Sequence, residues 1–278
     1  MALVKMKELL DDAKKNNYAV GAFEFWSLDS IRAIIEAAEE LNSPVILQAG
    51  ATELNFMGWD GVSRAVPYLI ENAKIKAALH LDHSTELKWV KMAVESGFSS
   101  VMIDASEMSF EKNVLITKET VEIAKPYGIT VEAELGRLPG FEGAVSVEDA
   151  EAFQTDADEA ARFVRETGID CLAVAVGTAH GMYKTKPKLN IARIKEIAGA
   201  VDVPLVLHGG SGTPDEMVRE AIKAGICKVN VCTEFMDAYR RSYLKGGHPS
   251  IRGLFEPAFF AGKEVIKEKI KLFGGIHE

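Results

Sequence analysis

Three histidines of this chain each stand at the end of a short apolar run. His83, His180 and His208 follow runs that are typical of buried strands, and each has glycine or aspartate beside it. In parallel α/β folds, ligand sites form outside the carboxyl ends of strands, where residues distant in sequence can meet. Three imidazoles that leave a fourth position open are a catalytic zinc arrangement. Any one of them could be a solvated loop residue or a partner of a ligand, but their shared placement favours a metal site.

Asp82 directly precedes the first of these histidines. A carboxylate there can orient a metal ligand through a hydrogen bond, or it can act as a general acid or base. Adjacent side chains of a strand point to opposite faces, so Asp82 and His83 should face different ways. This favours an acid–base role for Asp82, with its carboxylate directed toward the substrate.

Further carboxylates are candidates for the same site. Glu132 and Glu134 alternate with apolar residues, so they share one face of a predicted strand. An outward face would carry no function, whereas an inward one makes Glu134 a candidate alternate metal ligand. Glu142 lies in a long glycine-containing connection, and such loops are usually functional or mobile. Glu142 could swing into the site, although a solvated carboxylate is the simpler interpretation.

Two glycine- or asparagine-containing loops lead into predicted helices. The first is Gly209-Gly210-Ser211 with Thr213 as the expected N-cap, and the second runs from Asn230 to Thr233. Free backbone N–H groups at such helix starts can hold a phosphate. Each loop alone is more simply a helix cap. In barrels, however, the loops after strands seven and eight commonly bind phosphate, and both loops occupy those positions.

Strand-like and helix-like segments alternate along the whole chain. Strands are expected at 18–23, 45–48, 75–81, 99–103, 129–134, 171–176, 203–207 and 226–231. Helices are expected at 4–14, 28–41, 61–73, 85–96, 110–125, 156–167, 191–197 and 214–224, from 233, and at 257–272. The pattern predicts one domain over 1–278, a (β/α)8 TIM barrel with extra terminal helices. A doubly wound open sheet is the alternative. The barrel is favoured because both halves of the chain contribute candidate ligands.

Composition narrows the possible partners. The chain has 278 residues and a net charge of −9, which argues against a nucleic-acid or anionic-membrane surface. No apolar run approaches the length of a membrane span, and the charged N-terminal segment is no signal peptide. The cysteines Cys171, Cys227 and Cys232 form no CxxC pair and no disulfide framework. These features predict a cytoplasmic protein.

Motifs spread along the chain carry a resemblance to a known family. They are Ala19-Val-Gly-Ala-Phe, Leu79-His-Leu-Asp-His, Gly97-Phe-Ser-Ser-Val-Met-Ile-Asp-Ala-Ser, Glu132-Ala-Glu-Leu-Gly, Gly177-Thr-Ala-His-Gly-Met-Tyr-Lys, Leu207-His-Gly-Gly-Ser-Gly-Thr-Pro and Lys228-Val-Asn-Val-Cys-Thr-Glu. With these motifs the sequence, from Leu9 to about Leu272, resembles the class II, zinc-dependent ketose-bisphosphate aldolases of the fructose- and tagatose-bisphosphate type.

The resemblance implies roles for individual residues. It implies Zn2+ on His83, His180 and His208, with Glu134 and Asp104 near an alternate metal position, and Asp82 as the catalytic acid–base. Glu142 would be the proton carrier of a mobile loop, and Arg252 would reach the distal phosphate of a neighbouring subunit. The substrate-binding residues would be Gly181, Gly209, Gly210, Ser211, Asn230, Val231, Cys232 and Thr233. A monovalent cation, Na+ or K+, and a homodimer or homotetramer are also implied.

The chain departs from the family pattern mainly at the aldehyde half of the site. Glu24 stands where the family has asparagine, Gly50 where it has serine, and Cys232 where it has aspartate or alanine. The residues before Arg252 also differ. Glu24 is therefore a candidate substrate contact that favours an aldehyde other than glyceraldehyde 3-phosphate, with Trp26 as a candidate apolar wall. An arginine at 252 would instead suit a distal anion.

The predicted activity is zinc-dependent, reversible aldol cleavage of a phosphorylated ketose. The products would be dihydroxyacetone phosphate and an aldehyde, from a fructose or tagatose bisphosphate or a related ketose 1-phosphate. A Schiff-base aldolase would need a strand-end lysine in an apolar site, and Lys184, in a polar loop, and Lys228, expected to face outward, are poor candidates. A metal-binding sugar-phosphate epimerase and a non-catalytic sugar-phosphate-binding barrel remain alternatives. The presence of Asp82 argues against the latter.

Overall fold

A computed structural model describes residues 2–136, 154–178, 187–247 and 250–276. Within them, eight parallel strands close into a barrel in sequence order, and β1 pairs with β8 through registers such as Gly21↔Val229. The strands are β1 (Val20–Glu24), β2 (Val45–Ala49), β3 (Ala77–Ser84), β4 (Ser100–Ile103), β5 (Thr130–Leu135), β6 (Cys171–Val174), β7 (Leu205–Leu207) and β8 (Ile226–Val231). The predicted (β/α)8 barrel is thus confirmed, and closure excludes the open sheet.

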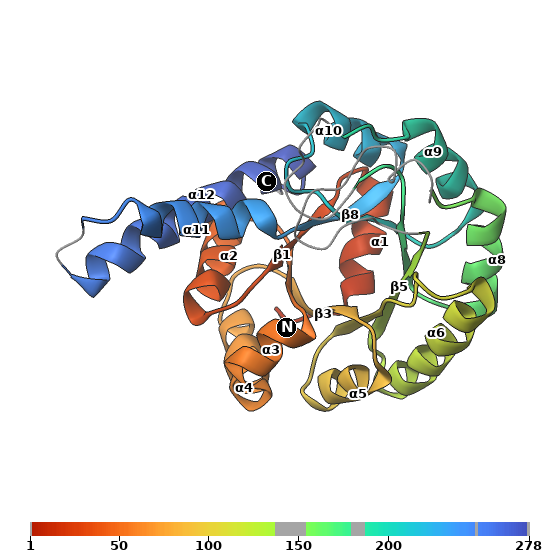
Figure 1. The fold of residues 1–278 in the computed structure, drawn as a ribbon, viewed down its shortest axis with the longest axis horizontal. Helices are drawn as coiled ribbons and strands as arrows, with labels where there is room; N and C mark the ends of the chain where they lie inside the picture. The colour runs from red at the N-terminus through yellow and green to blue at the C-terminus, as the bar shows by residue number, and fades with distance from the viewer. Residues whose placement is uncertain (1, 137–153, 179–186, 248–249, 277–278) are drawn as a thin grey trace.

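Helices surround the barrel on its outside (Figure 1). They are α1 (Met6–Asn16), α2 (Leu28–Glu40), α3 (Ala51–Met57), α4 (Trp59–Glu71), α5 (Leu87–Glu95), α6 (Phe110–Ala124), the 3₁₀ turn η1 (Lys125–Tyr127), α8 (Ala157–Thr167), α9 (Ile191–Ala200), α10 (Asp215–Ala224), α11 (Thr233–Leu244) and α12 (Ile251–Phe273). No helix among these described segments is long and apolar enough to cross a membrane.

Several elements differ from the expected ones, three helices among them. The short helix α3 was not predicted. Helix α10 begins at Asp215, and Thr213, the expected N-cap, instead donates its hydroxyl to the Gly209 carbonyl at 2.9 Å. The last helix begins at Ile251 instead of 257. Its true N-cap is Ser250, whose side chain accepts from the Gly253 N–H. The proline at 257 lies inside this helix, where a sequence pattern alone suggests a helix start.

The barrel interior changes from apolar to polar along the strands. Near their starts, Val20 and Ile46 belong to an apolar cluster that includes the buried face of α1. Helix α1 therefore closes the amino-terminal end of the barrel. Toward the strand ends the inward positions become polar, as at Glu24 on β1 and Gln48 on β2. The alternate residues of the strands pack outward against the helices in the main core.

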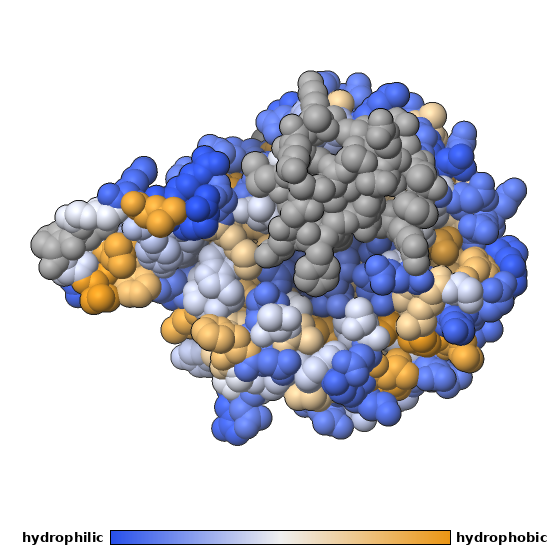
Figure 2. Space-filling view, in the orientation of Figure 1, coloured by the Kyte–Doolittle hydropathy of each residue, from blue (hydrophilic) through white to orange (hydrophobic). Residues whose placement is uncertain are grey.

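Helices α11 and α12 extend from the barrel as an antiparallel arm (Figure 1). Figure 2 shows apolar surface toward the end of this arm, where Leu244 and Ile251 are 71% and 70% exposed. At the base of the arm the two helices pack closely, and Gly262 of α12 lies against the rings of Phe235 and Tyr239.

We expect Gly262→Ala to destabilise the protein by about 1–3 kcal/mol, the usual cost of overpacking a core. A Cβ at this position would lie 2.2 Å from Tyr239 Cε2 and 2.7 Å from Phe235 Cε2. The matched control is Gly199→Ala in α9, where a Cβ meets no atom within 4 Å and helix propensity should slightly stabilise the protein. Urea unfolding midpoints measure both changes. Equal midpoints for the two variants would contradict the packing described.

Candidate active site

Ionisable and amide side chains fill the carboxyl-terminal end of the barrel interior. Each of them is less than 10% exposed. They are Glu24, Gln48, His80, Asp82, Glu132, Glu134, His208, Lys228 and Asn230. Buried charges are costly unless they are paired and hydrogen-bonded, so the contacts among these groups determine their arrangement.

Glu132 lies at the centre of this group. Its carboxylate accepts from Lys228 Nζ at 2.7 Å and lies 2.9 Å from His208 Nε2. Burial opposes ionisation, but the adjacent charges of Lys228 and His208 lower the pKa of Glu132 below its usual range. Lys228 is fully buried and faces the barrel interior, so the expectation that it faces outward was wrong. Both faces of a barrel strand are buried, and alternation alone does not tell which is inside.

Glu132 also orients His208. With Nε2 directed at Glu132, the other ring nitrogen, Nδ1, lies 3.2 Å from Glu134 Oε2 at the mouth of the barrel. Burial disfavours a charged imidazole, but the two carboxylates raise the pKa of His208 to about 10. The same negative surroundings favour a metal ion in place of that proton. A histidine held by a carboxylate on one nitrogen and open to a metal on the other is a common arrangement in zinc sites.

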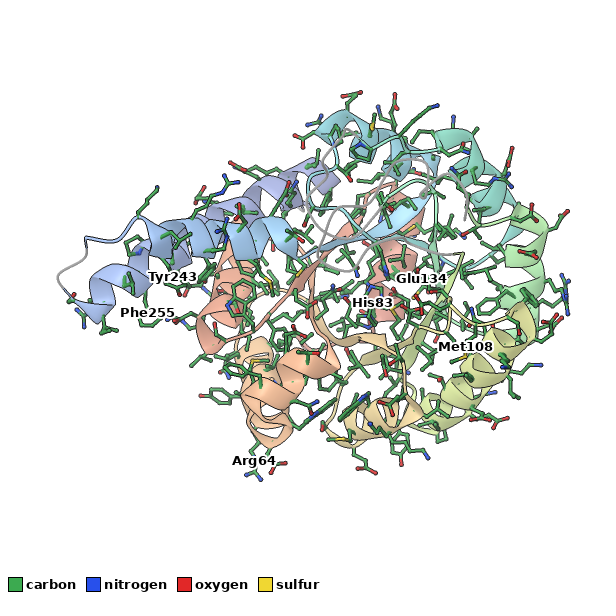
Figure 3. All side chains as sticks on the ribbon, in the orientation of Figure 1. Arg64, His83, Met108, Glu134, Tyr243 and Phe255 are labelled. Carbon is green, nitrogen blue, oxygen red and sulfur yellow. The ribbon has the colours of Figure 1, made fainter. Side chains whose placement is uncertain are left out.

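His83 reaches the same place through an irregular backbone. It has φ +41°, in the left-handed region, and the pairing of β3 with β4 shifts register between Leu81 and Ser84. The His83 and His208 ring centroids are 4.5 Å apart (Figure 3 labels His83 and Glu134). Asp104, at the end of β4, lies 2.9 Å from His83 Nδ1 and also accepts from Ser106.

These side chains form two overlapping sets of potential metal ligands. In each set, every residue offers one ligand atom within 4.8 Å of the others. One set is Asp82, His83 and His208, and the other is His83, Asp104 and Glu134. Imidazole and carboxylate are the donors that zinc accepts in catalytic sites, so the residues fit this metal.

Asp82 faces the barrel interior, as expected from alternation. Gln48 Nε2 donates to Asp82 Oδ2 at 2.8 Å, and Asn230 Nδ2 donates to Oδ1 at 3.2 Å. Burial opposes ionisation, but the positive charges of His83 and Lys228 lower the pKa of Asp82. Nearby His80 hydrogen-bonds Ser100, and burial, together with Lys228, lowers the pKa of His80 to about 3, so it is neutral. Two amides therefore hold an ionised carboxylate next to the potential metal ligands.

The two predicted phosphate loops lie against each other. Ser211 Oγ accepts from the backbone N–H groups of Cys232 and Glu234, at 3.3 and 3.2 Å. Gly210 N–H donates to the Asn230 carbonyl at 3.0 Å. A Cβ on Gly210 would lie 2.7 Å from that carbonyl oxygen, so only glycine fits. The amino end of α11, which begins at Thr233, thus adjoins the glycine loop.

Glu234 joins these loops to α12. Its carboxylate accepts from the Gly212 N–H at 2.8 Å and from Lys269 Nζ at 2.5 Å. Sequence reasoning missed Glu234, Lys269 and Gln48, because nothing in the residue pattern shows which polar groups on separate elements meet. Val231, one of the predicted substrate contacts, has its side chain in the outer core, so only its backbone is available.

Other predicted site residues are not brought together here. Glu142, His180 and Gly181 lie outside the described residues. Arg252 stands at the start of α12, in the part of the arm that lies away from the barrel (Figure 1). The ring of Trp26, expected as an apolar wall, packs against Phe235 at a centroid distance of 4.8 Å.

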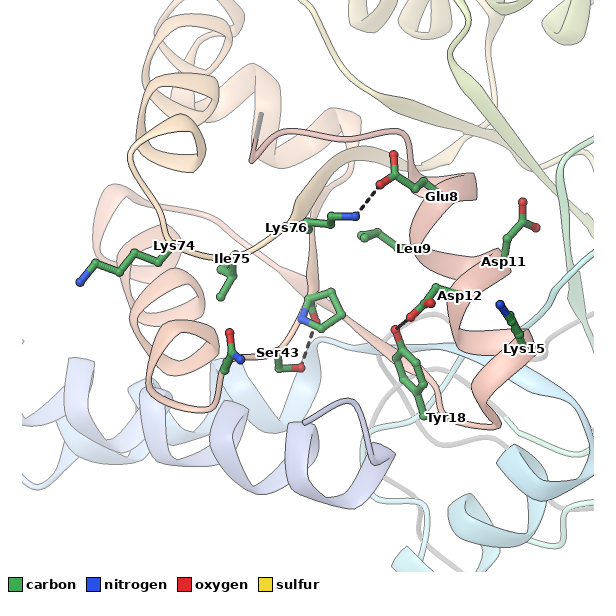
Figure 4. Close-up of a pocket in the computed structure, with 12 residues that line it drawn as sticks. Glu8, Leu9, Asp11, Asp12, Lys15, Tyr18, Ser43, Lys74, Ile75 and Lys76 are labelled. Atoms are coloured by element: carbon green, nitrogen blue, oxygen red, sulfur yellow. Dashed lines mark hydrogen bonds and ion pairs between the residues drawn. The ribbon is translucent and has the colours of Figure 1, made fainter. Parts of the chain in front are cut away.

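A groove at the opposite end of the barrel is a weaker candidate. It has a volume of about 560 Å³ and lies beside α1 (Figure 4). Its polar groups pair with one another: Lys76 Nζ contacts Glu8 at 2.7 Å, and the Tyr18 hydroxyl contacts Asp12 at 2.8 Å. Active sites of such barrels lie at the carboxyl-terminal face, where the clusters above are found.

Comparisons with known proteins show which family the chain belongs to. The sequence profile described as "Fructose-bisphosphate aldolase class-II" matches residues 4–278. The chain belongs to this aldolase family. It is therefore a carbon–carbon lyase, and the resemblance seen in the sequence is confirmed. The aldolase is 40% identical to a fructose-bisphosphate aldolase of Helicobacter pylori over 305 aligned positions, which cover 99% of each protein.

Solved structures support the same assignment. The YdjI aldolase from Escherichia coli K12 superposes with a TM-score of 0.90 at 36% identity, over 99% of this chain and 98% of that one. A putative fructose-1,6-biphosphate aldolase from Coccidioides immitis also gives 0.90, at 31% identity, over 98% and 96%.

We expect Lys228→Met to destabilise this aldolase by about 3–5 kcal/mol, because Glu132 is then left buried without its counter-charge. The double variant Lys228→Met/Glu132→Gln should recover part of that loss. Lys7→Met is the matched control, since its pair with Asp11 is about half exposed and worth under about 0.5 kcal/mol. Denaturant unfolding measures all three. A Lys228→Met variant as stable as the control would refute the buried ion pair.

Proposed function

We propose that this aldolase cleaves a phosphorylated ketose reversibly, with zinc, to dihydroxyacetone phosphate and an aldehyde. The observation that carries the proposal is the convergence of Asp82, His83 and His208 at the mouth of the barrel, with ligand atoms within 4.8 Å of one another. The Helicobacter pylori relative is described as a fructose-bisphosphate aldolase, which supports a ketose bisphosphate or a related ketose 1-phosphate as substrate.

His83 and His208 would hold the zinc ion, together with His180 by the family resemblance. Glu134 and Asp104 lie beside these histidines, which supports their role near an alternate metal position. Bound zinc supplies a Lewis acid that polarises the ketose carbonyl and stabilises the negative charge left by cleavage. Glu132 keeps His208 in one orientation for this purpose, through the contact with Nε2.

Asp82 would act as the acid–base. Its carboxylate takes the proton of the hydroxyl next to the breaking carbon–carbon bond, and returns it in the condensation direction. The amides of Gln48 and Asn230 position it for this transfer. Glu142 is proposed, from the family resemblance, to reprotonate the carbon of the ketose-phosphate half.

The phosphate of the ketose would bind at the paired loops after β7 and β8. The loop of Gly209, Gly210 and Ser211, which adjoins the amino end of α11, suits a phosphate dianion. Asn230, Cys232 and Thr233 line the second loop, and Gly181 would complete the site. A monovalent cation, Na+ or K+, is proposed to assist here, as the resemblance implies.

We also propose a homo-oligomer, either a dimer or a tetramer. The exposed apolar residues Leu244, Ile251 and Phe255 on the arm support it, since such surface usually marks an interface. Arg252 of one subunit would then approach the site of another. The three cysteines form no disulfide, which suits a reducing compartment, and the cytoplasm is the proposed location.

Membership of the aldolase family favours carbon–carbon cleavage over the epimerase and the non-catalytic barrel. A Schiff-base mechanism would need an available lysine, and the Lys228 amine is bound by Glu132 at 2.7 Å. The proposed aldol cleavage therefore uses a metal instead of a covalent lysine adduct.

Metal removal tests the proposal directly. We expect a chelator to abolish turnover and added zinc or cobalt to restore it, measured by coupled detection of dihydroxyacetone phosphate. His83→Ala and His208→Ala should lose bound zinc, as determined by metal analysis, while the circular dichroism spectrum keeps its barrel signature. Trapping of a substrate–lysine adduct by borohydride would instead establish Schiff-base chemistry and end the zinc proposal.

Asp82→Ala tests the acid–base assignment. We expect it to retain zinc and substrate affinity but to lose cleavage by about 10²-fold or more, the usual contribution of a positioned acid–base. Turnover and zinc content are measured on the same preparation, with Asp60→Ala on the exposed face of α4 as the control. Loss of zinc from the Asp82 variant would show that this carboxylate supports the metal instead.

A further inference from the structure

Two carboxylates gather on the β1–β2 side of Asp82. Glu24, the last residue of β1, is 6% exposed, and its Oε1 accepts from the Gly50 N–H at 2.9 Å. Gln48 Nε2 lies between Glu24 Oε2, at 3.4 Å, and Asp82 Oδ2, at 2.8 Å. The second carboxylate, Glu53 of α3, covers Gly50: a Cβ on that glycine would lie 3.0 Å from Glu53 Oε2.

This side of the site contains negative charge without a matching cation. No ion pair among the described residues includes Glu24 or Glu53. Burial, followed by the charges of Asp82 and Glu53, raises the pKa of Glu24 well above its usual value. Surroundings that resist the ionisation of their own carboxyl group also disfavour a phosphate dianion. Arg252 does not offset these charges within this chain, because it lies on the arm (Figure 1).

The same side offers acceptors for hydroxyl groups. Gln48 is 1% exposed, and its Oε1 has no hydrogen-bond partner among the described residues. Among the residues that the structure describes, Glu24 Oε2 makes only the long contact to Gln48. A buried acceptor without a donor is costly, and a substrate hydroxyl can supply that donor. The absence of a side chain at Gly50 also removes a hydroxyl that could donate to an anion.

The position of this cluster relates it to the aldehyde product. Asp82 is the proposed acid–base at the hydroxyl of the aldehyde half, and Gln48 contacts both Asp82 and Glu24. The part of the substrate beyond the cleaved bond then lies against Glu24, Gln48 and Glu53.

We propose that Glu24, Gln48 and Glu53 select an aldehyde with an uncharged, hydroxylated chain, so that the preferred substrate is a ketose 1-phosphate without a second phosphate. This inference rests on the proposed function, since it concerns the aldehyde half of the same aldol cleavage. Gln48 and Glu24 accept from hydroxyl groups of the aldehyde chain, and the negative charges of Asp82 and Glu53 beside Glu24 exclude a distal phosphate.

The test compares kcat/KM of the zinc-loaded enzyme for fructose 1-phosphate and tagatose 1-phosphate with that for the two 1,6-bisphosphates. We expect the wild-type enzyme to favour the 1-phosphates by at least about tenfold, equivalent to one repulsive charge contact. Glu24→Gln, which keeps the shape, and Glu24→Asn should each raise kcat/KM for the bisphosphates and reduce that preference. Glu71→Gln on the exposed surface of α4 is the matched control and should leave it unchanged.

The outcomes separate this inference from the proposed function. Efficient cleavage of fructose 1,6-bisphosphate, unchanged by Glu24→Gln, would overturn the selectivity but leave zinc-dependent aldol cleavage intact. Release of no dihydroxyacetone phosphate from any of the four ketoses would count against the proposed function itself. A wild-type preference for the 1-phosphates that disappears in Glu24→Gln, with Glu71→Gln unaffected, supports the inference.

Discussion

A carboxylate buried in the barrel, Glu132, determines the positions of the groups around it. Without partners, the burial of this charge would cost several kcal/mol of stability. The ends of β7 and β8 must therefore place His208 and Lys228 within hydrogen-bond distance of Glu132. The apolar cluster beneath, closed by α1, excludes water from below. Once Glu132 holds Nε2 of His208, the other ring nitrogen can only face Glu134 and the mouth of the barrel. The orientation of this potential metal ligand therefore follows from a buried carboxylate that is itself held by an ion pair between β5 and β8.

Much of the fold follows from apolar periodicity in the sequence. The predicted strand at 226–231 coincides with β8, and the shared face of Glu132 and Glu134 is found inside the barrel. Apolar periodicity does not predict which side chains face the barrel interior where both faces of a strand are buried. Lys228 alternates with apolar neighbours and was expected to face outward. It is buried because it pairs with Glu132 at 2.7 Å, and that partner lies ninety-six positions away in the sequence. The short α3 was also missed, because seven residues after a glycine give too little pattern to distinguish a helix from a loop.

The position of His83 in the site depends on a backbone irregularity in β3 that residue types do not reveal. Strict alternation along β3 places Asp82 inside and turns His83 away from it. The register shift and the left-handed conformation of His83 turn its ring back over the barrel mouth. A β-branched or bulky residue is strained in that conformation, at a cost of the order of 1 kcal/mol, which the surrounding contacts must offset. Asp104 at 2.9 Å supplies one of those contacts.

The predicted phosphate loops contact the arm as well as the barrel. Glu234 holds the Gly212 N–H, and an acidic group so close to an anion site would oppose phosphate binding if it stood alone. Lys269, only 9% exposed, neutralises it from α12. That helix runs without interruption from Ile251 on the arm to Phe273 beneath β1, where the Phe273 carbonyl accepts from the Ala19 N–H. The packing of the arm and the charge balance at the predicted phosphate loops therefore both depend on one continuous helix.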